Sequence, residues 1–345
     1  MNIPRIPLFS QDYMSISSSY NDTSINPSVA PSYVAPILST AIPSTQLVAD
    51  TQMGSTNTMQ ISPQTSSPRF PSLPTNDLRG VEKYRLIQKI GSGGQGSVYE
   101  AENKMNGRIV ALKVLNIDSK NINSASRELA TLEKISTPAC HPFIVCYYNH
   151  YFDQINRQLF IEMEYIEGLT LAKWARKFTG PSLHNKLLLA IDDLCKALLF
   201  IHSQGIIHRD IKPENIIITT ENVPKLIDFG LSCFTQVCYQ NVACCKQDPG
   251  TFPYMAPETY AVRESYFVTD VWSLGVSFFV VSTGLYPFNF SNAKTIDEYR
   301  YIVLNNRPLA LTTPNEKLNM IVNSCLNPNP ATRITIPQIQ AIIRS

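Results

Sequence analysis

The segment IIHRDIKPENIII, residues 206–218, sets charged side chains between two isoleucine-rich runs. Because isoleucine favours buried elements, we expect the polar residues to lie at a turn between two such elements. Asp210 can accept the proton of an attacking hydroxyl, and Lys212 can neutralise a transferring phosphoryl group. Asn215 offers an oxygen ligand to a hard cation, and Asp228 in KLIDFG can bind Mg²⁺ that bridges two phosphates. Phosphoryl transfer requires mainly positioning and charge neutralisation, and this set supplies both.

A glycine-rich segment, GSGGQGSV, lies upstream and has the pattern GxGxxGxV. A dinucleotide-binding fold requires a helix after the glycines, but strand-like sequence follows here, and the Gly-Lys-Ser/Thr ending of a Walker A loop is missing. The remaining interpretation is a hairpin whose backbone N–H groups lie over phosphates. Taken alone, the segment is also compatible with an ordinary flexible hairpin. The candidate binding residues are Gly91, Ser92, Gly93, Gly94, Gln95, Gly96 and Val98.

A lysine follows on a predicted strand, IVALKVL, where period two places Ala111 and Lys113 on one face. The small alanine leaves room for a flat base, and the lysine can reach phosphate oxygens. A lysine among apolar neighbours requires a carboxylate partner. The next predicted helix offers Glu128. Glu133 is less suited, because five helical positions turn it by about 140°.

The elements that must position these residues can be read from hydrophobic periodicity. Strands are predicted at 84–90, 97–103, 108–116, 143–153 and 157–166, and one helix at 122–136. From about Leu169 the pattern is mostly helical. The apolar run 271–281 is too short to span a bilayer of about 30 Å, so it predicts a buried core helix and no membrane span. The fold class is therefore α+β.

The first 79 residues differ in composition from the rest. Residues 1–77 hold two basic and four acidic residues and one glycine, and Ser, Thr, Pro, Asn and Gln dominate. Such a segment cannot bury enough apolar surface to offset the entropy of ordering, so we predict a disordered tail over 1–79.

The charge and the cysteines restrict the class of protein. A net charge of +2 provides no basic field for nucleic acid, so no nucleic-acid partner is expected. The N-terminus shows no signal-peptide pattern. Eight scattered cysteines without repeated CxxC pairs favour a reduced, intracellular and cytoplasmic protein over a disulfide scaffold.

Seven motifs occur in one order along the chain. They are GxGxxGxV (91–98), VALK (110–113), Glu128, HRDxKxxN (208–215), DFG (228–230), APE (256–258) and DVWSLG (270–275). With them the chain resembles the eukaryotic-type serine/threonine protein kinases over 80–345. The resemblance implies a bilobal fold, with a small lobe of β-sheet and one helix at about 80–166 and a larger, mainly helical lobe at about 167–345.

The resemblance also implies a role for each motif residue. Asp210 would be the catalytic base, Lys212 would meet the γ-phosphate of ATP, and Asn215 and Asp228 would hold Mg²⁺. Thr251 in GTFPYMAPE would bridge Asp210 and Lys212, and with Lys212 it indicates protein substrates that carry serine or threonine. Glu214 favours a basic residue near the target hydroxyl, but substrate preference stays open.

Further residues are implied around the nucleotide and between the lobes. Lys113 would contact the α- and β-phosphates and pair with Glu128. The residues implied around the adenine are Val98, Ala111, Met163, Glu164, Ile166 and Ile217. Those implied for an apolar column anchored by Asp270 are Leu132, Tyr147, His208 and Phe229. Glu258 would pair with Arg333.

Two departures from the family pattern concern helices. The sequence after ATRIT predicts a curtailed last helix, and the linker from Lys113 to Glu128 is slightly short, which leaves the start of the intervening helix open. His141 and His202 are interpreted as structural residues rather than ligands.

The segment between DFG and APE lacks a hydroxyl at 246–249, shortly before Gly250, where relatives often carry a phosphate that docks on the arginine of HRD. We therefore expect activity without phosphorylation there, with Asp248 supplying a constitutive charge. The segment also carries four cysteines, which are Cys233, Cys238, Cys244 and Cys245. We interpret them as plain thiols, with a redox or metal role as the alternative.

Two other classes compete with an active protein kinase. A pseudokinase or scaffold would bind ATP or partners without transfer, but such proteins usually lose the lysine, the base or the metal-binding aspartate, and this chain keeps all three. A small-molecule kinase is disfavoured by GTFPYMAPE, which is typical of a peptide-docking segment.

Overall fold

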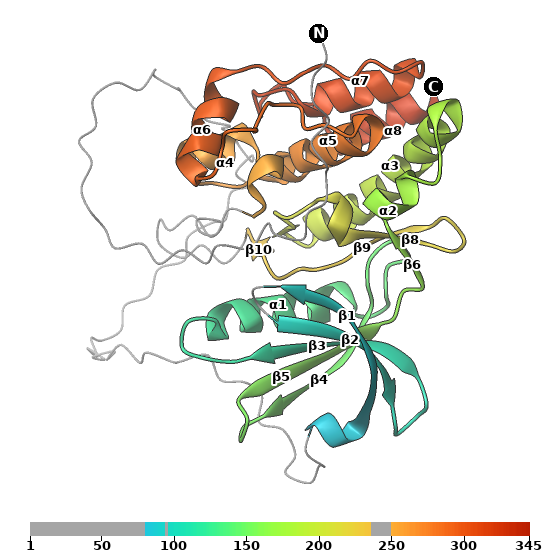
Figure 1. The fold of residues 1–345 in the computed structure, drawn as a ribbon, viewed down its shortest axis with the longest axis vertical. Helices are drawn as coiled ribbons and strands as arrows, with labels where there is room; N and C mark the ends of the chain where they lie inside the picture. The colour runs from blue at the N-terminus through green and yellow to red at the C-terminus, as the bar shows by residue number, and fades with distance from the viewer. Residues whose placement is uncertain (1–79, 94–95, 236–249) are drawn as a thin grey trace, which may run out of the picture. The chain divides into compact units, whose positions relative to one another are not determined.

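The computed structural model describes residues 80–93, 96–235 and 250–345. The predicted tail at 1–79 therefore lies outside the described residues, as do Gly94, Gln95, Asp248, Cys238, Cys244 and Cys245. Figure 1 shows a sheet-containing lobe with one helix and a lobe built mainly from helices, which confirms the α+β fold class.

The smaller lobe is an antiparallel five-stranded sheet in the order β1-β2-β3-β5-β4, with α1 packed beside it (Figure 1). A short 3₁₀ helix, η1 (Gly80–Lys83), leads into it. Its elements are β1 (Tyr84–Gly93), β2 (Gly96–Asn103), β3 (Ile109–Asn116), α1 (Ile122–Ile135), β4 (Tyr147–Asp153) and β5 (Gln158–Glu164). Strands β1–β2, β2–β3 and β4–β5 pair as antiparallel neighbours in sequence, whereas β3 pairs with β5 across the insertion of α1. The glycine segment forms the β1–β2 hairpin, with Gly93 opposite Gly96.

The larger lobe holds seven helices among the described residues. They are α2 (Leu171–Ala175), α3 (Gly180–Ser203), α4 (Pro257–Val262), α5 (Phe267–Thr283), α6 (Ile296–Asn305), α7 (Glu316–Cys325) and α8 (Ile336–Arg344). The nine-residue α8 agrees with the prediction of a short last helix. Helix α5 is buried along most of its length, with Trp272 and Phe278 fully enclosed, as predicted for 271–281.

Short strands in this lobe were not predicted from the sequence. They are β6 (Gly168–Thr170), β7 (Ile206–Ile207), β8 (Ile216–Thr219), β9 (Pro224–Leu226) and β10 (Cys233–Phe234). Strand β8 pairs with both β6 and β9, and β7 pairs with β10. Two- to four-residue strands are too brief to show alternation, so periodicity could not separate them from loops.

One predicted strand is shorter than expected, because 143–153 becomes strand only from Tyr147. The backbone of the preceding residues pairs with β9 instead: Leu226 donates to the carbonyl of Phe143 at 2.9 Å, and Val145 donates to that of Leu226 at 3.0 Å. The Cys146 carbonyl accepts from Glu164 at 2.8 Å. This connection therefore joins the two lobes.

The cysteines differ from the expectation of plain thiols. Cys140 and Cys146 are joined as a disulfide, and Cys233 is also disulfide-bonded. Cys195 and Cys325 are buried thiols. The expectation of a plain thiol was therefore wrong at Cys233, and the expectation of a reduced protein does not hold at Cys140 and Cys146, because proximity in the fold, which spacing alone does not reveal, decides which cysteines can pair.

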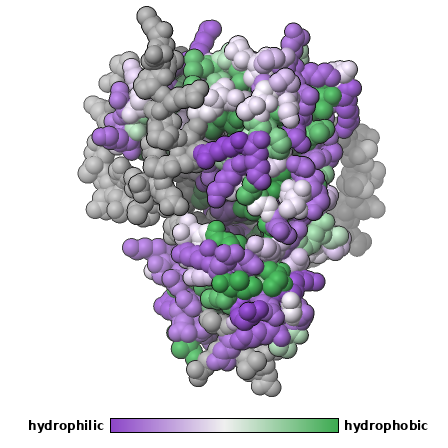
Figure 2. Space-filling model, turned by 45° about the vertical axis from the view of Figure 1, so that its right-hand side comes forward, coloured by the Kyte–Doolittle hydropathy of each residue, from purple (hydrophilic) through white to green (hydrophobic). Residues whose placement is uncertain are grey.

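The main hydrophobic core extends from the inner face of α1 through the helical lobe to α7 and α8. On the face in Figure 2, polar side chains cover much of the surface and apolar ones show in smaller groups between them. Within the described part of the chain, no helix is both long enough and apolar enough to cross a membrane.

Candidate active site

The loop with Asp210 is fixed at both ends by buried isoleucines. Strand β7 precedes it and β8 follows it, which agrees with the expected turn between buried elements. A 3₁₀ turn, η2 (Pro213–Asn215), folds Asn215 back so that its Nδ2 donates to the backbone and side-chain oxygens of Asp210, both at 2.8 Å. Lys212 Nζ donates to Asp210 Oδ2 at 2.7 Å. The structure thus brings all three predicted loop residues together.

Thr251 joins this set from the other side. Its Oγ1 donates to Asp210 Oδ1 at 2.8 Å and accepts from Lys212 Nζ at 2.7 Å, which is the bridge that the resemblance implied. The preceding Gly250 makes the approach possible. Its φ is +91°, and a Cβ there would lie 2.5 Å from the Arg209 carbonyl oxygen, so only glycine fits without displacement.

Lys113 lies between two carboxylates. Its Nζ pairs with Glu128 Oε1 and reaches Asp228 Oδ1 at 3.1 Å. Burial would lower the pKa of Lys113, but the charges of Asp228 and Glu128 outweigh it and raise the pKa, so the amine is protonated at neutral pH. Glu133 points elsewhere and contacts Tyr147, as its angular offset predicted.

Asp228 is held ionised by the same lysine. The Lys113 charge lowers the pKa of Asp228 to about 2, against the opposing effect of burial. Its side chain remains 44% exposed. The residue has φ of +62°, a left-handed conformation that non-glycine residues seldom adopt and that is concentrated at functional sites. Ile227 N donates to the Asn215 carbonyl at 2.9 Å, which ties this segment to the Asp210 loop.

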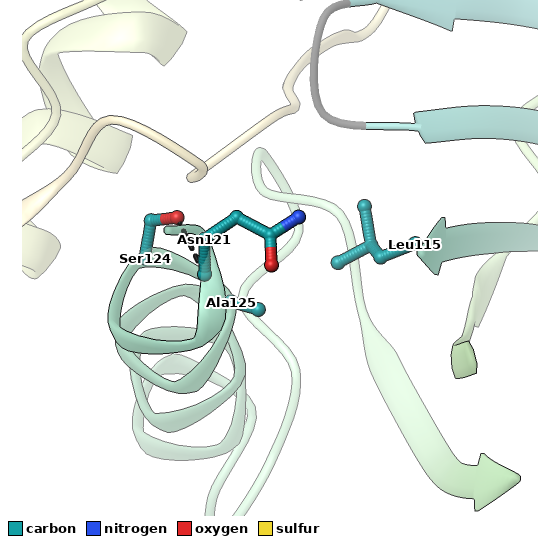
Figure 3. Close-up of a pocket in the computed structure, with 4 residues that line it drawn as sticks. All are labelled: Leu115, Asn121, Ser124 and Ala125. Carbon is teal, nitrogen blue, oxygen red and sulfur yellow. Dashed lines mark hydrogen bonds between the residues drawn. The ribbon is translucent and has the colours of Figure 1, made fainter. Parts of the chain in front are cut away.

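Figure 3 shows how α1 begins, the point that the short linker had left open. Asp118 and Asn121 form a compact turn in which Asn121 Oδ1 accepts from Asp118 N at 2.9 Å, and Asn121 Nδ2 donates to the Asn116 carbonyl at 2.6 Å. Ser124 Oγ donates to the Asn121 carbonyl at 2.8 Å (Figure 3). The helix that begins at this turn carries Glu128, which pairs with Lys113.

Asp270 on α5 binds the backbone of the Asp210 loop. Asp270 Oδ2 accepts from His208 N at 3.0 Å, and Oδ1 accepts from Arg209 N at 2.9 Å. Arg209 Nε donates to the Leu231 carbonyl at 2.6 Å. Sequence reasoning missed that His202 Nε2 also lies 2.8 Å from Asp270 Oδ2. No local pattern signals this contact, because 68 positions separate the two residues.

The predicted column is largely assembled. The His208 and Phe229 rings meet edge-on with centroids 4.8 Å apart, and both residues lie with Leu132 in the buried core. Tyr147 is only half-buried, and its hydroxyl contacts His150 at 2.7 Å. The fourth position is therefore partly polar, not wholly apolar as expected.

Three of the residues implied around the adenine, Val98, Ala111 and Met163, lie on neighbouring strands of the five-stranded sheet. Ala111 pairs with Met163, and Val98 pairs with Lys113, while Ile217 lies on β8. Ile166 lies just after β5, half-buried against the core. Gly91 and Ser92 lie on β1, and a Cβ on Gly96 would lie 2.3 Å from the Val114 carbonyl.

The Glu164 side chain has a contact that the sequence did not suggest. Its carboxylate pairs with Lys225 on β9 at 2.8 Å and accepts from Cys146 N at 3.2 Å. Glu164 thus stabilises the connection between the lobes.

Comparison with known proteins agrees with this geometry. The family model described as the protein kinase domain matches residues 84–342, so the chain belongs to the protein kinase domain family. It is 28% identical over 288 residues to the serine/threonine-protein kinase PknD of Chlamydia trachomatis serovar D, covering 74% of this chain and 30% of that protein.

Two other relatives are similar at comparable levels. The serine/threonine-protein kinase PknE of Mycobacterium tuberculosis is 32% identical over 209 residues, covering 59% of this chain and 35% of that protein. Mitogen-activated protein kinase kinase 3 of Arabidopsis thaliana is 29% identical over 266 residues, covering 74% and 48%. The chain thus spans between about a third and a half of the length of these relatives.

Proposed function

We propose that this protein is a serine/threonine protein kinase that transfers the γ-phosphate of ATP to hydroxyl groups of protein substrates. The observation that carries the proposal is the connected set Asp210–Lys212–Thr251, which lies beside a second set formed by Lys113 and Asp228. The first suits a hydroxyl and the second suits phosphates. The names of the relatives support the same activity.

The residues fit a magnesium ion and a nucleotide. Asp228 is ionised and 44% exposed, so its oxygens are available to a hard cation. Asn215 uses its amide nitrogen on Asp210, which leaves its amide oxygen as a ligand. Asp228 and Asn215 would hold Mg²⁺, which neutralises charge on the phosphate oxygens. Lys113 would contact the α- and β-phosphates, with Glu128 holding it in place.

The remaining nucleotide contacts follow from the sheet. Backbone N–H groups of the β1–β2 hairpin would cover the phosphates, and the hairpin residues proposed for this are Gly91, Ser92, Gly93, Gly94, Gln95 and Gly96. The apolar residues proposed to enclose the adenine are Val98, Ala111, Met163 and Ile217. Because Glu164 N already donates to Cys146, the polar contacts to the base would come from the Glu164 carbonyl and the Ile166 backbone.

In the transfer, the substrate oxygen bonds to the γ-phosphorus while the bond to the β–γ bridging oxygen breaks, and ADP leaves. Asp210 accepts the hydroxyl proton. Thr251 and Lys212 hold the two carboxylate oxygens of Asp210, which fixes the direction of proton acceptance. Lys212 also meets the charge that develops on the transferring group.

Incubation of the full chain with radiolabelled Mg-ATP and a generic protein substrate tests the proposal. We expect phosphoserine and phosphothreonine in the wild type, and transfer reduced at least about 100-fold in Asp210→Asn, because a positioned base contributes about 10²–10⁴ to the rate. Glu221→Gln, which neutralises an exposed carboxylate in the β8–β9 turn, is the matched control and should retain activity. Wild-type ATP binding with no transfer above Asp210→Asn would leave a scaffold instead.

A further inference from the structure

A buried contact between two hydroxyl groups joins α1 to the segment that follows Asp228. Ser232 Oγ lies 3.1 Å from Thr131 Oγ1, and both residues are 0% exposed. Thr131 is one helical turn after Glu128, whereas Ser232 lies four residues after Asp228. The contact therefore links the two elements that carry the carboxylates on either side of Lys113.

The hydrogen atoms of the contact can be assigned from the neighbouring acceptors. Thr131 Oγ1 donates its one hydrogen to the Arg127 carbonyl at 2.8 Å. Ser232 Oγ lies 2.7 Å from the Phe229 carbonyl oxygen, which also accepts from Ser232 N at 3.0 Å, and 3.1 Å from Thr131 Oγ1. Its one hydrogen is shared between these two acceptors, which gives a chain from Ser232 through Thr131 to the helix backbone.

The bond between the two hydroxyl groups depends on the position of α1. If α1 moves away, Thr131 keeps its bond to the Arg127 carbonyl and Ser232 keeps its bond to the Phe229 carbonyl, so the bond that is lost is the one that joins the two elements. The bridge is made only when α1 packs against the segment after Asp228. That same packing sets the Lys113–Glu128 and Lys113–Asp228 contacts.

We infer that Thr131 and Ser232 are positioning residues, which hold α1 against the Asp228 segment and so keep Lys113, Glu128 and Asp228 in their working arrangement. Neither side chain touches substrate. The inference rests on the proposed kinase activity and names two residues that hold the active-site side chains in position.

Steady-state kinetics of the full chain with varied Mg-ATP tests this bridge. Thr131→Val keeps the shape of the side chain but removes the acceptor, and we expect kcat/KM for Mg-ATP to fall about tenfold, mainly in kcat. Thr131→Ser restores the hydroxyl and should return the value to within about twofold of wild type. Ser232→Ala removes this contact and also the bond to the Phe229 carbonyl, so it should lower the value at least as far as Thr131→Val does, and the double variant should be no worse than Ser232→Ala alone.

Thr137→Val is the matched control. Thr137 Oγ1 donates to the Glu133 carbonyl at 2.9 Å, so it makes the same bond to a carbonyl four residues earlier, but it is exposed. Its kinetics should match wild type. If Thr131→Val lowers only the melting temperature and keeps the kcat of the control, the inference is overturned. Absence of transfer by the wild type would instead refute the proposed function.

Discussion

The ion pairs Glu258–Arg333 and Lys113–Glu128 are both buried, yet their hydrogen bonding differs. Arg333 binds Glu258 through two parallel bonds, at 2.7 and 2.8 Å, and also donates to the carbonyls of Val268 and Asn327. Thr269 donates to Glu258 at 3.1 Å. In contrast, Glu128 Oε2 is buried with no hydrogen-bond partner among the described residues, and Lys113 is shared with Asp228.

The difference shows two uses of buried charge. A bidentate pair with its remaining donors satisfied fixes one geometry and joins α4 to the segment before α8. A lysine divided between two carboxylates, one of them exposed, keeps a charge available for an anionic ligand. We therefore expect the first pair to affect mainly folding stability and the second to affect mainly catalysis.

The largest expected effect is on the first pair. Arg333→Met leaves Glu258 buried without its partner, which should lower the free energy of unfolding by about 3–5 kcal/mol. Urea denaturation of the full chain measures it. Arg85→Met is the control, because the Arg85 side chain is 65% exposed and its pair with Glu102 should contribute less than about 1 kcal/mol. Equal losses in the two variants would contradict a special role for Arg333.

Lys113→Met is expected to act on transfer rather than on stability. The loss of a preorganised cation should lower kcat by about 10²–10³. The loss of unfolding free energy should be smaller than in Arg333→Met. The Asp228 side chain is already exposed to solvent, and one oxygen of the Glu128 carboxylate, Oε2, already lacks a hydrogen-bond partner among the described residues. Kinetics and urea denaturation on the same samples compare the two, and the distinction fails if Lys113→Met unfolds as readily as Arg333→Met.

Thr269→Val tests the Glu258–Arg333 pair with a smaller expected loss of stability than Arg333→Met. It removes the third hydrogen bond to Glu258 and the cap that Thr269 provides to Tyr266 N. The free energy of unfolding should fall by about 1–2 kcal/mol, while kcat stays at the wild-type value. Measurement of both on one preparation checks it. A large loss of kcat without loss of stability would place this pair in the catalytic machinery instead.

The smallest expected effect is the contribution of the Asp228 carboxylate to the pH dependence of folding stability. The pKa of this carboxyl is lowered from about 3.8 to about 2 in the folded protein. A lowered pKa stabilises the fold above about pH 4, and this contribution is lost as pH falls toward 2. The stability of the wild type relative to Asp228→Asn should therefore decrease over that range in acid titrations followed by circular dichroism. A constant difference would mean that Lys113 does not hold the carboxylate ionised.

Sequence reasoning succeeded where neighbouring residues act together. Asp210, Lys212 and Asn215 lie within six positions, so one turn brings them together and their chemistry can be read locally. The long strands and α1 showed clear periodicity. The short strands β6 to β10, by contrast, lack enough residues to reveal a period, and the start of β4 was misplaced because its first residues pair with β9.

Contacts between distant residues needed the fold. His202 and Asp270, Glu164 and Lys225, and Thr131 and Ser232 are each more than 60 positions apart, and no spacing rule relates them. The bonding of Cys140 to Cys146 also escaped prediction, although only six positions separate them, because the turn between them decides whether their side chains meet.

The sequence by itself therefore determined the kinase family, the fold class and the motif residues, because ordered motifs and periodic strands are properties of local sequence. Only the tertiary structure decided which side chains share hydrogens across the two lobes, how fully each buried charge is satisfied, and which hydroxyl group holds α1 in place. Those outcomes depend on packing among residues far apart in the chain, where burial makes every unpaired polar group costly.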